Sequence, residues 1–278
     1  MVTTRAEDGV VHVRGPDSQV PVTQEGSSSA TRVWLWRIVS VAGFGLAWAA
    51  LLESGLLSRH SFAGPIETLE WFWSWHASGD SLTHLASTLT AAAMGYLIGL
   101  LLGAAVAALF VFVRGFESVL DPYMAVVNGI PKIIIAPFVV AVFGLGIWSK
   151  VTVAALLVFF VSFFNLVNGL KSVNRALINN LRVLGASHWR MATDLYVPAV
   201  FSWAMTTLRI GVGFALIGVI VGEFVGSTHG VGHVIKVAGE LNEPARLLGA
   251  LLTLFIFSIL IDRLFSNIER RFSRWDIL

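Results

Sequence analysis

Six apolar stretches, each about as long as a bilayer is thick, constrain this chain of 278 residues more than any other feature. A helix of about 20 apolar residues crosses the hydrocarbon core, where it satisfies its own backbone hydrogen bonds. The stretches are Val33–Leu52, Leu85–Val113, Tyr123–Leu145, Val151–Leu170, Met205–Val225 and Leu247–Leu264. We therefore expect an all-α, polytopic membrane protein with six transmembrane helices.

Composition supports this expectation and narrows the partners. Charged residues make up 13% of the chain, against about 25% in soluble domains. The net charge of +2 is spread over many sites and does not suggest a nucleic-acid partner. The chain has no cysteine, which excludes disulfides, thiolate metal sites and cysteine nucleophiles. The lipid bilayer is the expected surrounding.

The third apolar stretch is interrupted. Gly129, Pro131 and Pro137 fall within it, and a proline inside a helix removes a backbone donor and clashes with the preceding turn. Irregular backbone at membrane depth is tolerated where it is buried in protein or lines a cavity. We therefore expect a kinked or broken span here.

Basic residues in the loops predict the orientation, because cytoplasmic loops carry an excess of Lys and Arg. The loop after the fourth stretch and the C-terminal tail are basic, with Lys171, Arg175, Arg182, Arg190, Arg270, Arg271 and Arg274. The loop Glu53–His84 is acidic, whereas Ser227–Arg246 is mixed and fits less cleanly. Both termini are therefore expected to be cytoplasmic.

Two segments outside the spans have a character of their own. Residues 1–31 are polar and lack the order of a signal peptide, so we expect a disordered cytoplasmic tail before a transmembrane domain at 32–278. After Pro65, apolar and tryptophan residues recur at helical spacing. This pattern predicts a short helix lying in the outer membrane interface.

The polar segment Lys171–Pro198 is too polar to span and too long for a simple turn. Asn174 can cap a first helix and Gly185 can stop it, while Ser187 can cap a second helix that Pro198 ends. Two short amphipathic helices on the cytoplasmic side need an apolar cover. Either they pack on the protein's own helix ends, or they insert into a groove of a cytoplasmic partner.

A family resemblance begins in this segment. Leu184–Ser187, followed by Val197–Ala199, resembles the cytoplasmic loop of binding-protein-dependent ABC importer permeases. Further motifs follow the family's order and point to its nitrate/sulfonate/taurine branch: Ile130–Gly146, Gly169–Val173, Leu208–Gly211, Val221–Phe224, Gly230–Gly232 and Glu269–Trp275. The similarity covers roughly Phe62–Trp275, and the combination of motifs is specific where each alone is weak.

The resemblance implies a half-transporter with the type I ABC importer permease fold in the bacterial inner membrane. Such a chain pairs with a second copy or a homologous permease, binds cytoplasmic ATPase subunits and receives substrate from an external binding protein. It implies no cofactor in this chain, with ATP and Mg on the ATPase partner. Carried over by position, the ATPase-coupling contacts fall on Asn179, Asn180, Leu184, Gly185, Ala186, Ser187, Trp189 and Arg190.

One departure from the family pattern lies at the centre of this coupling loop. The family's Glu-Ala-Ala falls on Asn179, Asn180 and Leu181, so the acidic residue is absent while Gly185 is kept. Asparagine retains hydrogen-bonding ability but loses the strength of a charge-assisted bond. The change indicates either a matched change in the ATPase or a second, different permease.

Polar groups inside the spans are the default candidates for a substrate pathway, because lipid disfavours them. The candidates are Asn128, Pro131, Lys132, Asn165 and Glu223. Lys132 follows the break at Pro131, where a cation would suit an anionic substrate. Three structural alternatives remain: Lys132 snorkels or pairs with an acid, Asn165 bridges helices, and Glu223 is structural.

Enzyme signatures are absent from the sequence. There is no Walker loop, no Ser-His-Asp order and no carboxylate pair, and His229 and His233 lack a third metal ligand. We predict a non-catalytic permease that imports a small organic anion, taurine-like or an aromatic carboxylate. Nitrate, bicarbonate or a pyrimidine precursor is the alternative cargo. An ion-gradient secondary transporter is the rival class, although no inverted repeat supports it.

Overall fold

The computed structural model describes residues 6–7, 10–11, 22–23 and 30–272. Its contacts divide the chain into two units, Met1–Leu57 and Ser58–Leu278. In the first unit, the strands β1 (Ala6–Glu7), β2 (Val10–Val11) and β3 (Val22–Thr23) pair antiparallel in that order. Most of the tail for which we expected disorder, residues 1–31, lies outside the described residues.

Helix α1 (Ala30–Glu53) completes the first unit. Its 22 residues from Arg32 onward are apolar enough to cross a membrane, which agrees with the first predicted span. Trp34, Trp36 and Phe44 are exposed around the helix. A helix that is apolar on all sides needs lipid or another protein around it.

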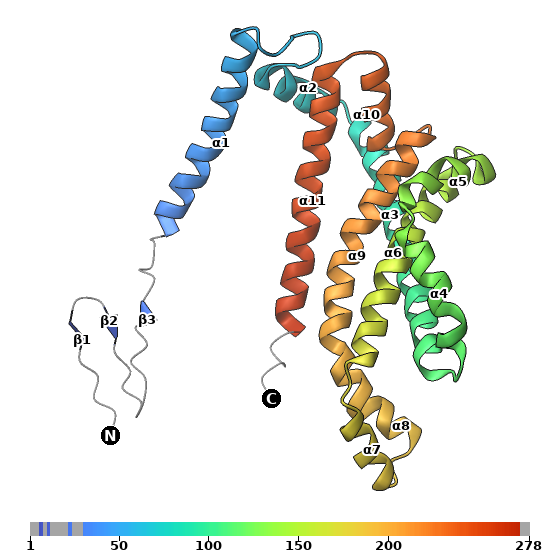
Figure 1. Cartoon of the computed structure of the whole chain (residues 1–278). Helices are drawn as coiled ribbons and strands as arrows, with labels where there is room; N and C mark the ends of the chain where they lie inside the picture. The colour runs from blue at the N-terminus through green and yellow to red at the C-terminus, as the bar shows by residue number, and fades with distance from the viewer. Residues whose placement is uncertain (1–5, 8–9, 12–21, 24–29, 273–278) are drawn as a thin grey trace. The chain divides into compact units, whose positions relative to one another are not determined.

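The second unit is a helical bundle (Figure 1). Its elements are α2 (Pro65–Ala77), α3 (Asp80–Phe112), α4 (Phe116–Gly129), the 3₁₀ turn η1 (Lys132–Ile135), α5 (Ala136–Phe143), α6 (Ile147–Lys171), α7 (Arg175–Val183), α8 (His188–Met191), the π turn η2 (Ala192–Tyr196), α9 (Val197–Val225), α10 (Val231–Glu240) and α11 (Pro244–Phe272). Together with α1, the described residues provide five long apolar helices and one bent pair. Counting the bent pair as one span gives the six predicted spans.

The bent pair is the interrupted third stretch. Helix α4 ends at Gly129, Pro131 is extended, and the chain turns by 88° before α5. Pro137 lies in the first turn of α5, where a missing N–H costs nothing. The predicted break is therefore confirmed, and it is made by Gly129 and Pro131 rather than by Pro137.

Close packing of α3, α6 and α9 forms the core. The buried residues Ala91, Ala154, Val158, Ala215 and Val219 share one cluster across the three helices. Glycines on α3 allow its backbone to approach α6, because a Cβ at Gly99 would lie 2.5 Å from the carbonyl oxygen of Ala155. Small residues at helix interfaces serve this purpose in membranes, where burying apolar surface gives no advantage over lipid.

Candidate functional site

The polar segment after α6 forms a helical tip, which we define as Asn174–Met191. Asn174 caps α7, since its Oδ1 accepts a hydrogen bond from the N–H of Ala176 at 2.8 Å. Gly185 ends α7 with a φ of +74°. The N–H of Gly185 bonds to the carbonyl of Arg182, and that of Ala186 to the carbonyl of Leu181. These two bonds make a Schellman motif, which satisfies the last carbonyls of the helix.

The second half of the tip differs from expectation. Ser187 caps α8 as predicted, because its Oγ accepts from the N–H of Arg190 at 3.3 Å. The prediction that Pro198 ends the second helix is wrong. The π turn η2 joins α8 to α9, and Pro198 lies in the first turn of α9. The N–H of Val197 reaches back five residues to Ala192, so the wide turn accommodates the proline and one continuous apolar helix runs from Trp189 to Val225.

Large apolar side chains on the tip are uncovered. Val183, Leu184 and Trp189 are 87%, 80% and 77% exposed. Of the other predicted coupling residues, Asn179, Asn180, Gly185, Ser187 and Arg190 are exposed and Ala186 is half-buried. The tip does not pack these side chains on the chain's own helix ends, which favours the partner-docking alternative. In Figure 1 the tip lies at the end of the bundle away from α2 and α10.

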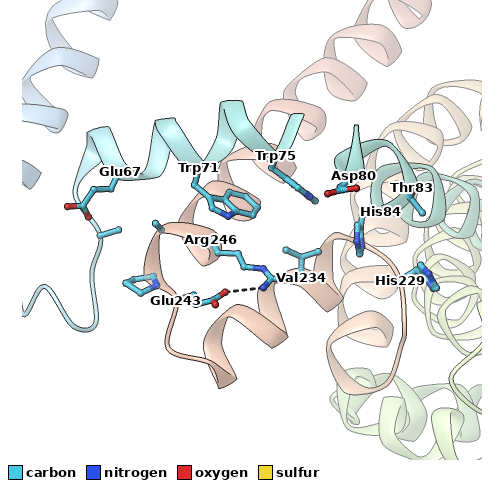
Figure 2. Close-up of a pocket in the computed structure, with 13 residues that line it drawn as sticks. Glu67, Trp71, Trp75, Asp80, Thr83, His84, His229, Val234, Glu243 and Arg246 are labelled. Atoms are coloured by element: carbon cyan, nitrogen blue, oxygen red, sulfur yellow. Dashed lines mark hydrogen bonds and ion pairs between the residues drawn. The ribbon is translucent and has the colours of Figure 1, made fainter. Parts of the chain in front are cut away.

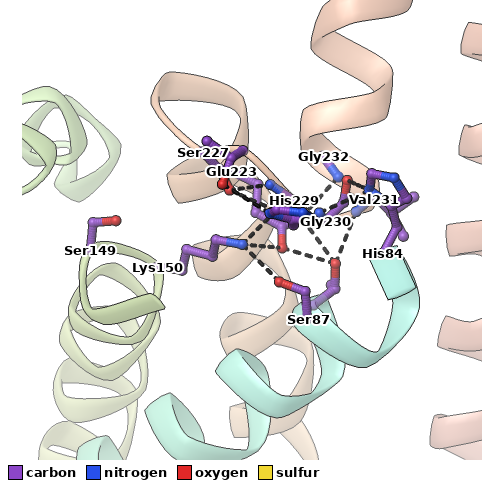
Figure 3. Close-up of polar contacts among 12 residues, drawn as sticks. His84, Ser87, Ser149, Lys150, Glu223, Ser227, His229, Gly230, Val231 and Gly232 are labelled. Atoms are coloured by element: carbon purple, nitrogen blue, oxygen red, sulfur yellow. Dashed lines mark hydrogen bonds and ion pairs between the residues drawn. The ribbon is translucent and has the colours of Figure 1, made fainter. Parts of the chain in front are cut away.

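A buried polar network occupies the opposite end of the bundle (Figure 3). At its centre, Lys150 Nζ on α6 lies 3.4 Å from Glu223 Oε1 on α9, and the two side chains are 3% and 0% exposed. Thr88 Oγ1 on α3 donates to the Glu223 carboxylate at 2.9 Å. Three spans therefore meet at one ion pair.

The network also holds the start of α10. The N–H groups of Gly230, Val231 and Gly232 donate to His84 Nδ1, Thr88 Oγ1 and Glu223 Oε2, at 3.1, 3.0 and 2.9 Å. Helix α10 begins after a glycine and has no capping side chain of its own. Its first donors are thus satisfied by side chains from α3 and α9, and a carboxylate lies at the positive end of the helix dipole.

Lys150 is fully partnered. Besides Glu223, its ammonium donates to Ser87 Oγ at 2.9 Å and to the carbonyl of His229, which uses the three donors of a lysine. Only glycine fits at position 230 in the loop before α10. Gly230 has a φ of +122°, and any Cβ on it would collide with the Glu223 carboxylate. The pair and the loop are built to fit each other.

Sequence reasoning named Glu223 but missed Lys150. A lysine directly before the apolar stretch Val151–Leu170 reads as the marker of a span's end. The available signal was charge pairing: Lys150 and Glu223 stand at equivalent ends of consecutive long helices, and a charge in such a place needs a partner.

Lys132 lies at the break of the third span. Its Nζ donates to the carbonyl of Asn128 at 3.0 Å and to Asn128 Oδ1 at 3.2 Å, and lies 4.8 Å from the ring centre of Phe160 on α6. Asn128 and Pro131 are exposed, and Lys132 and Asn165 are half-buried. The structure thus brings Asn128 and Lys132 together beside α6. Glu223 is enclosed in the polar network instead.

A pocket of about 840 Å³ adjoins the polar network, between α2, the start of α3, α10 and the start of α11 (Figure 2). Trp71 and Trp75 line it, together with Asp80, His84 and His229, and Glu243 pairs with Arg246 at 3.0 Å on its rim. Within residues 30–272 and the short strands, no group of three or more His, Cys, Asp or Glu side chains is arranged to hold a metal ion.

His233 on α10 lies beside this pocket without lining it. Its Nδ1 is buried and lacks a hydrogen-bond partner among the described residues, and its ring stacks 6.5 Å from that of His84. Burial lowers the pKa of His233, and the neighbouring charges of His84, Lys236, His229 and Lys150 lower it further.

Comparison with known proteins agrees with the geometry. Residues 95–274 match the family described as binding-protein-dependent transport system inner membrane component. The chain is 26% identical over 242 residues, 87% of its length and 88% of the relative's, to a protein named as an aliphatic sulfonates transport permease in Bacillus subtilis. It is 31% identical over 205 residues, 74% of its length and 76% of the relative's, to the riboflavin transport system permease protein of Chloroflexus aurantiacus.

A solved structure extends the likeness to the fold. One chain of a bacterial ABC transporter involved in the import of the acidic polysaccharide alginate superposes with a TM-score of 0.60. The match covers 87% of the present chain and 96% of that chain, at 16% identity. At that identity the likeness establishes the fold and nothing finer.

Proposed function

The chain belongs to the family of binding-protein-dependent transport system inner membrane components, and we propose that, as the permease subunit of an ABC importer, it carries a small organic anion. It is a multi-pass protein of the bacterial inner membrane. Permease subunits of such importers are not catalytic, and ATP is hydrolysed on a separate subunit.

The helical tip is the proposed ATPase contact. Its exposed Leu184 and Trp189 flank the Gly185 turn and present apolar surface at the end of the bundle. Asn179 and Asn180 offer neutral hydrogen-bonding groups beside it. The remaining predicted contacts, Ala186, Ser187 and Arg190, lie in the same segment. Because α8 continues into α9, a displacement of the tip is transmitted directly to a membrane span.

This docking places the tip in the cytoplasm and therefore the polar network and the pocket on the outer side of the membrane. The same orientation puts both termini in the cytoplasm, and it agrees with the basic residues of the tip and the tail. The external binding protein then meets α2, α10 and the loops between spans. We further propose that two permeases pair, either two copies of this chain or this chain and a homologue.

Lys132 is the single observation that carries the proposal of an anionic substrate. Its ammonium lies beside Asn128 at a break in a span, and neither residue is enclosed by the chain's own packing. No Asp or Glu pairs with Lys132 among the described residues. We propose that Asn128, Pro131, Lys132 and Asn165 line the pathway and that Glu223 serves the outer polar network.

Relatives set the range of substrates to test. One is named for aliphatic sulfonates and another for riboflavin. A taurine-like sulfonate or an aromatic carboxylate is the first choice, because each offers an anionic group to Lys132. A planar heterocycle is the second candidate, since the Phe160 ring lies next to the Lys132 ammonium. Nitrate and bicarbonate complete the panel as small inorganic anions.

Reconstitution tests the proposal. The permease is assembled in proteoliposomes with its ATPase and its binding protein, and uptake of each labelled candidate is measured with and without ATP. We expect ATP-dependent uptake of an organic anion that falls at least tenfold in Lys132→Met. Uptake driven by an ion gradient without the ATPase would establish the rival secondary transporter. ATP-dependent uptake of a neutral or cationic solute alone would refute the anion proposal.

A further inference from the structure

We propose that Lys150 and Glu223 are positioning residues that hold α10 to the outer ends of α3, α6 and α9, so that this outer block moves as one rigid body during transport. The proposal rests on the importer function for its meaning in a transport cycle. Its structural half concerns only how α10 is held and can be measured on the chain by itself.

Helix α10 is attached through the backbone at its start. Three consecutive N–H groups, those of Gly230, Val231 and Gly232, donate to side chains of other helices. A helix end that leaves its bundle loses all of these partners together. Water would replace them at an exposed site, but here both Thr88 and Glu223 are buried.

Separating Lys150 from Glu223 has a high free-energy cost. A buried ion pair contributes little net stability, because desolvation offsets its attraction, yet removing one partner is strongly destabilising. Lys150 draws one of its partners from the loop, the carbonyl of His229, and Glu223 draws one from α10, the N–H of Gly232. Moving α10 away would leave both charges under-partnered in a low-dielectric site. The pair therefore serves to hold α10 in one position more than it serves to raise the stability of the fold.

Apolar packing joins α10 to the same helices and to two more. Val231 and Val234 of α10 are at most 2% exposed and share one cluster with Trp75, Leu85 and Ala250. This cluster adds α2 and α11 to the outer block. By contrast, no residue of α4, all of which the structure describes, is buried. Helix α4 contributes only partly buried residues to the packing of the chain, so it is held less tightly than α10.

A reversible cross-link tests the rigid block in the working importer. The chain has no cysteine, so the variant His84→Cys/His233→Cys contains a single thiol pair, at positions whose rings lie 6.5 Å apart. The replacement of His84 removes the acceptor of the Gly230 N–H but keeps Thr88, Lys150 and Glu223, so transport is compared within this variant alone, before and after cross-linking. A short, reducible bifunctional thiol reagent joins the two in the reconstituted complex. We expect transport within twofold of that of the same variant before cross-linking. Loss of transport on cross-linking, restored by reduction, would overturn the proposal. Each single-cysteine variant treated alike controls for labelling.

Hydrogen exchange tests the attachment without any substrate. In Glu223→Gln, the amides of residues 230–232 should exchange at least tenfold faster than in the native chain. The matched control is Glu240→Gln, which breaks the exposed pair of α10 with Lys236 at 3.8 Å and should change those amides less than twofold. Equal protection in Glu223→Gln and the native chain would overturn the proposal.

A double variant separates positioning from plain stability and covers poor folding of the single variant. Lys150→Met/Glu223→Leu removes both charges while keeping apolar volume. We expect its thermal midpoint to recover toward the native value while residues 230–232 remain unprotected and ATP hydrolysis runs with reduced transport. Recovery of protection together with the midpoint would show a merely stabilising pair. A native importer without ATP-dependent uptake would instead refute the importer function and leave the exchange result standing.

Discussion

The two ends of the helical bundle differ in what they expose: the tip presents apolar side chains, and the other end encloses a polar network. At the tip, Leu184 and Trp189 are largely exposed, and the local backbone is fixed by Asn174 and the Gly185 turn. At the other end, Lys150 and Glu223 are buried and their hydrogen-bonding groups are used. The tip thus has a well-defined backbone but leaves its apolar side chains uncovered. The polar network, by contrast, finds its hydrogen-bond partners within one chain. An exposed apolar surface on an ordered backbone supports the proposal that a partner docks at the tip.

Removing one partner of the buried ion pair should have the largest effect on the stability of the chain. Lys150→Met leaves Glu223 as an uncompensated buried charge, and we expect a loss of about 3–5 kcal/mol of stability. Thermal unfolding of the detergent-solubilised chain measures this. Trp189→Ala at the exposed tip is the matched control and should leave the unfolding midpoint unchanged. A Lys150→Met chain as stable as the native one would show that Glu223 does not need Lys150 as a partner.

Substitution of a glycine in the core should have the second-largest effect on stability. Gly99→Ala places a Cβ 2.5 Å from the backbone oxygen of Ala155, and overpacking of this kind costs about 1–3 kcal/mol. Gly213 on α9 has no atom of the described chain within 4 Å of such a Cβ. Gly213→Ala should therefore be neutral or stabilising by up to about 1 kcal/mol through helix propensity. Chemical unfolding of both variants in one detergent decides whether α3 and α6 pack this closely.

The Gly185 turn should affect the partner more than the chain. Its φ of +74° disfavours any residue with a side chain, at about 1–2 kcal/mol, and no neighbouring atom adds a collision. We expect Gly185→Val to weaken ATPase binding by about tenfold, equivalent to about 1.4 kcal/mol. Gly185→Asn, which tolerates this conformation, should lose less. Titration of the ATPase onto the reconstituted permease measures both, and equal affinity for the native chain and Gly185→Val would place the contact elsewhere.

Acidity should give the smallest effect, and only at the end of the bundle that holds the polar network. Burial lowers the pKa of His233 below its usual 6.5, so below about pH 6.5 the unfolded chain binds more protons than the folded one. Stability contributed by the neutral form is present above that pH and is lost as the pH falls. The unfolding midpoint should decline between pH 7 and 5.5 and decline less in His233→Gln. Identical slopes in the native chain and in His233→Gln would show that His233 does not cause the decline.

Local patterns were enough to predict much of the fold. The six spans, the break at Gly129 and Pro131, and the caps at Asn174, Gly185 and Ser187 follow from apolar length and backbone chemistry. These features depend on residues close together in the chain. The partner-docking role of the tip stays a prediction, since no partner is present to show the contact.

Contacts between distant residues were not predictable in the same way. Lys150 and Glu223 are 73 residues apart in the sequence, and their meeting depends on how α6 and α9 pack. Hydrophobic periodicity gives the buried side of a helix but not its neighbour. The π turn was missed for a related reason: Pro198 reads as a stop unless the preceding turn is known to be wide.

The π turn has a further consequence for how the tip is aimed. An α-helix advances about 100° per residue, so the one extra residue of a π turn rotates everything before it relative to everything after it. Ala192–Tyr196 therefore sets the angle about the helix axis between the exposed side of the tip and span α9. Deleting one residue there would leave both parts helical and would turn Trp189 to another side of the helix. Substitutions within Ala192–Tyr196 that keep the π turn would preserve this angle, whereas a change in the length of the segment would alter it.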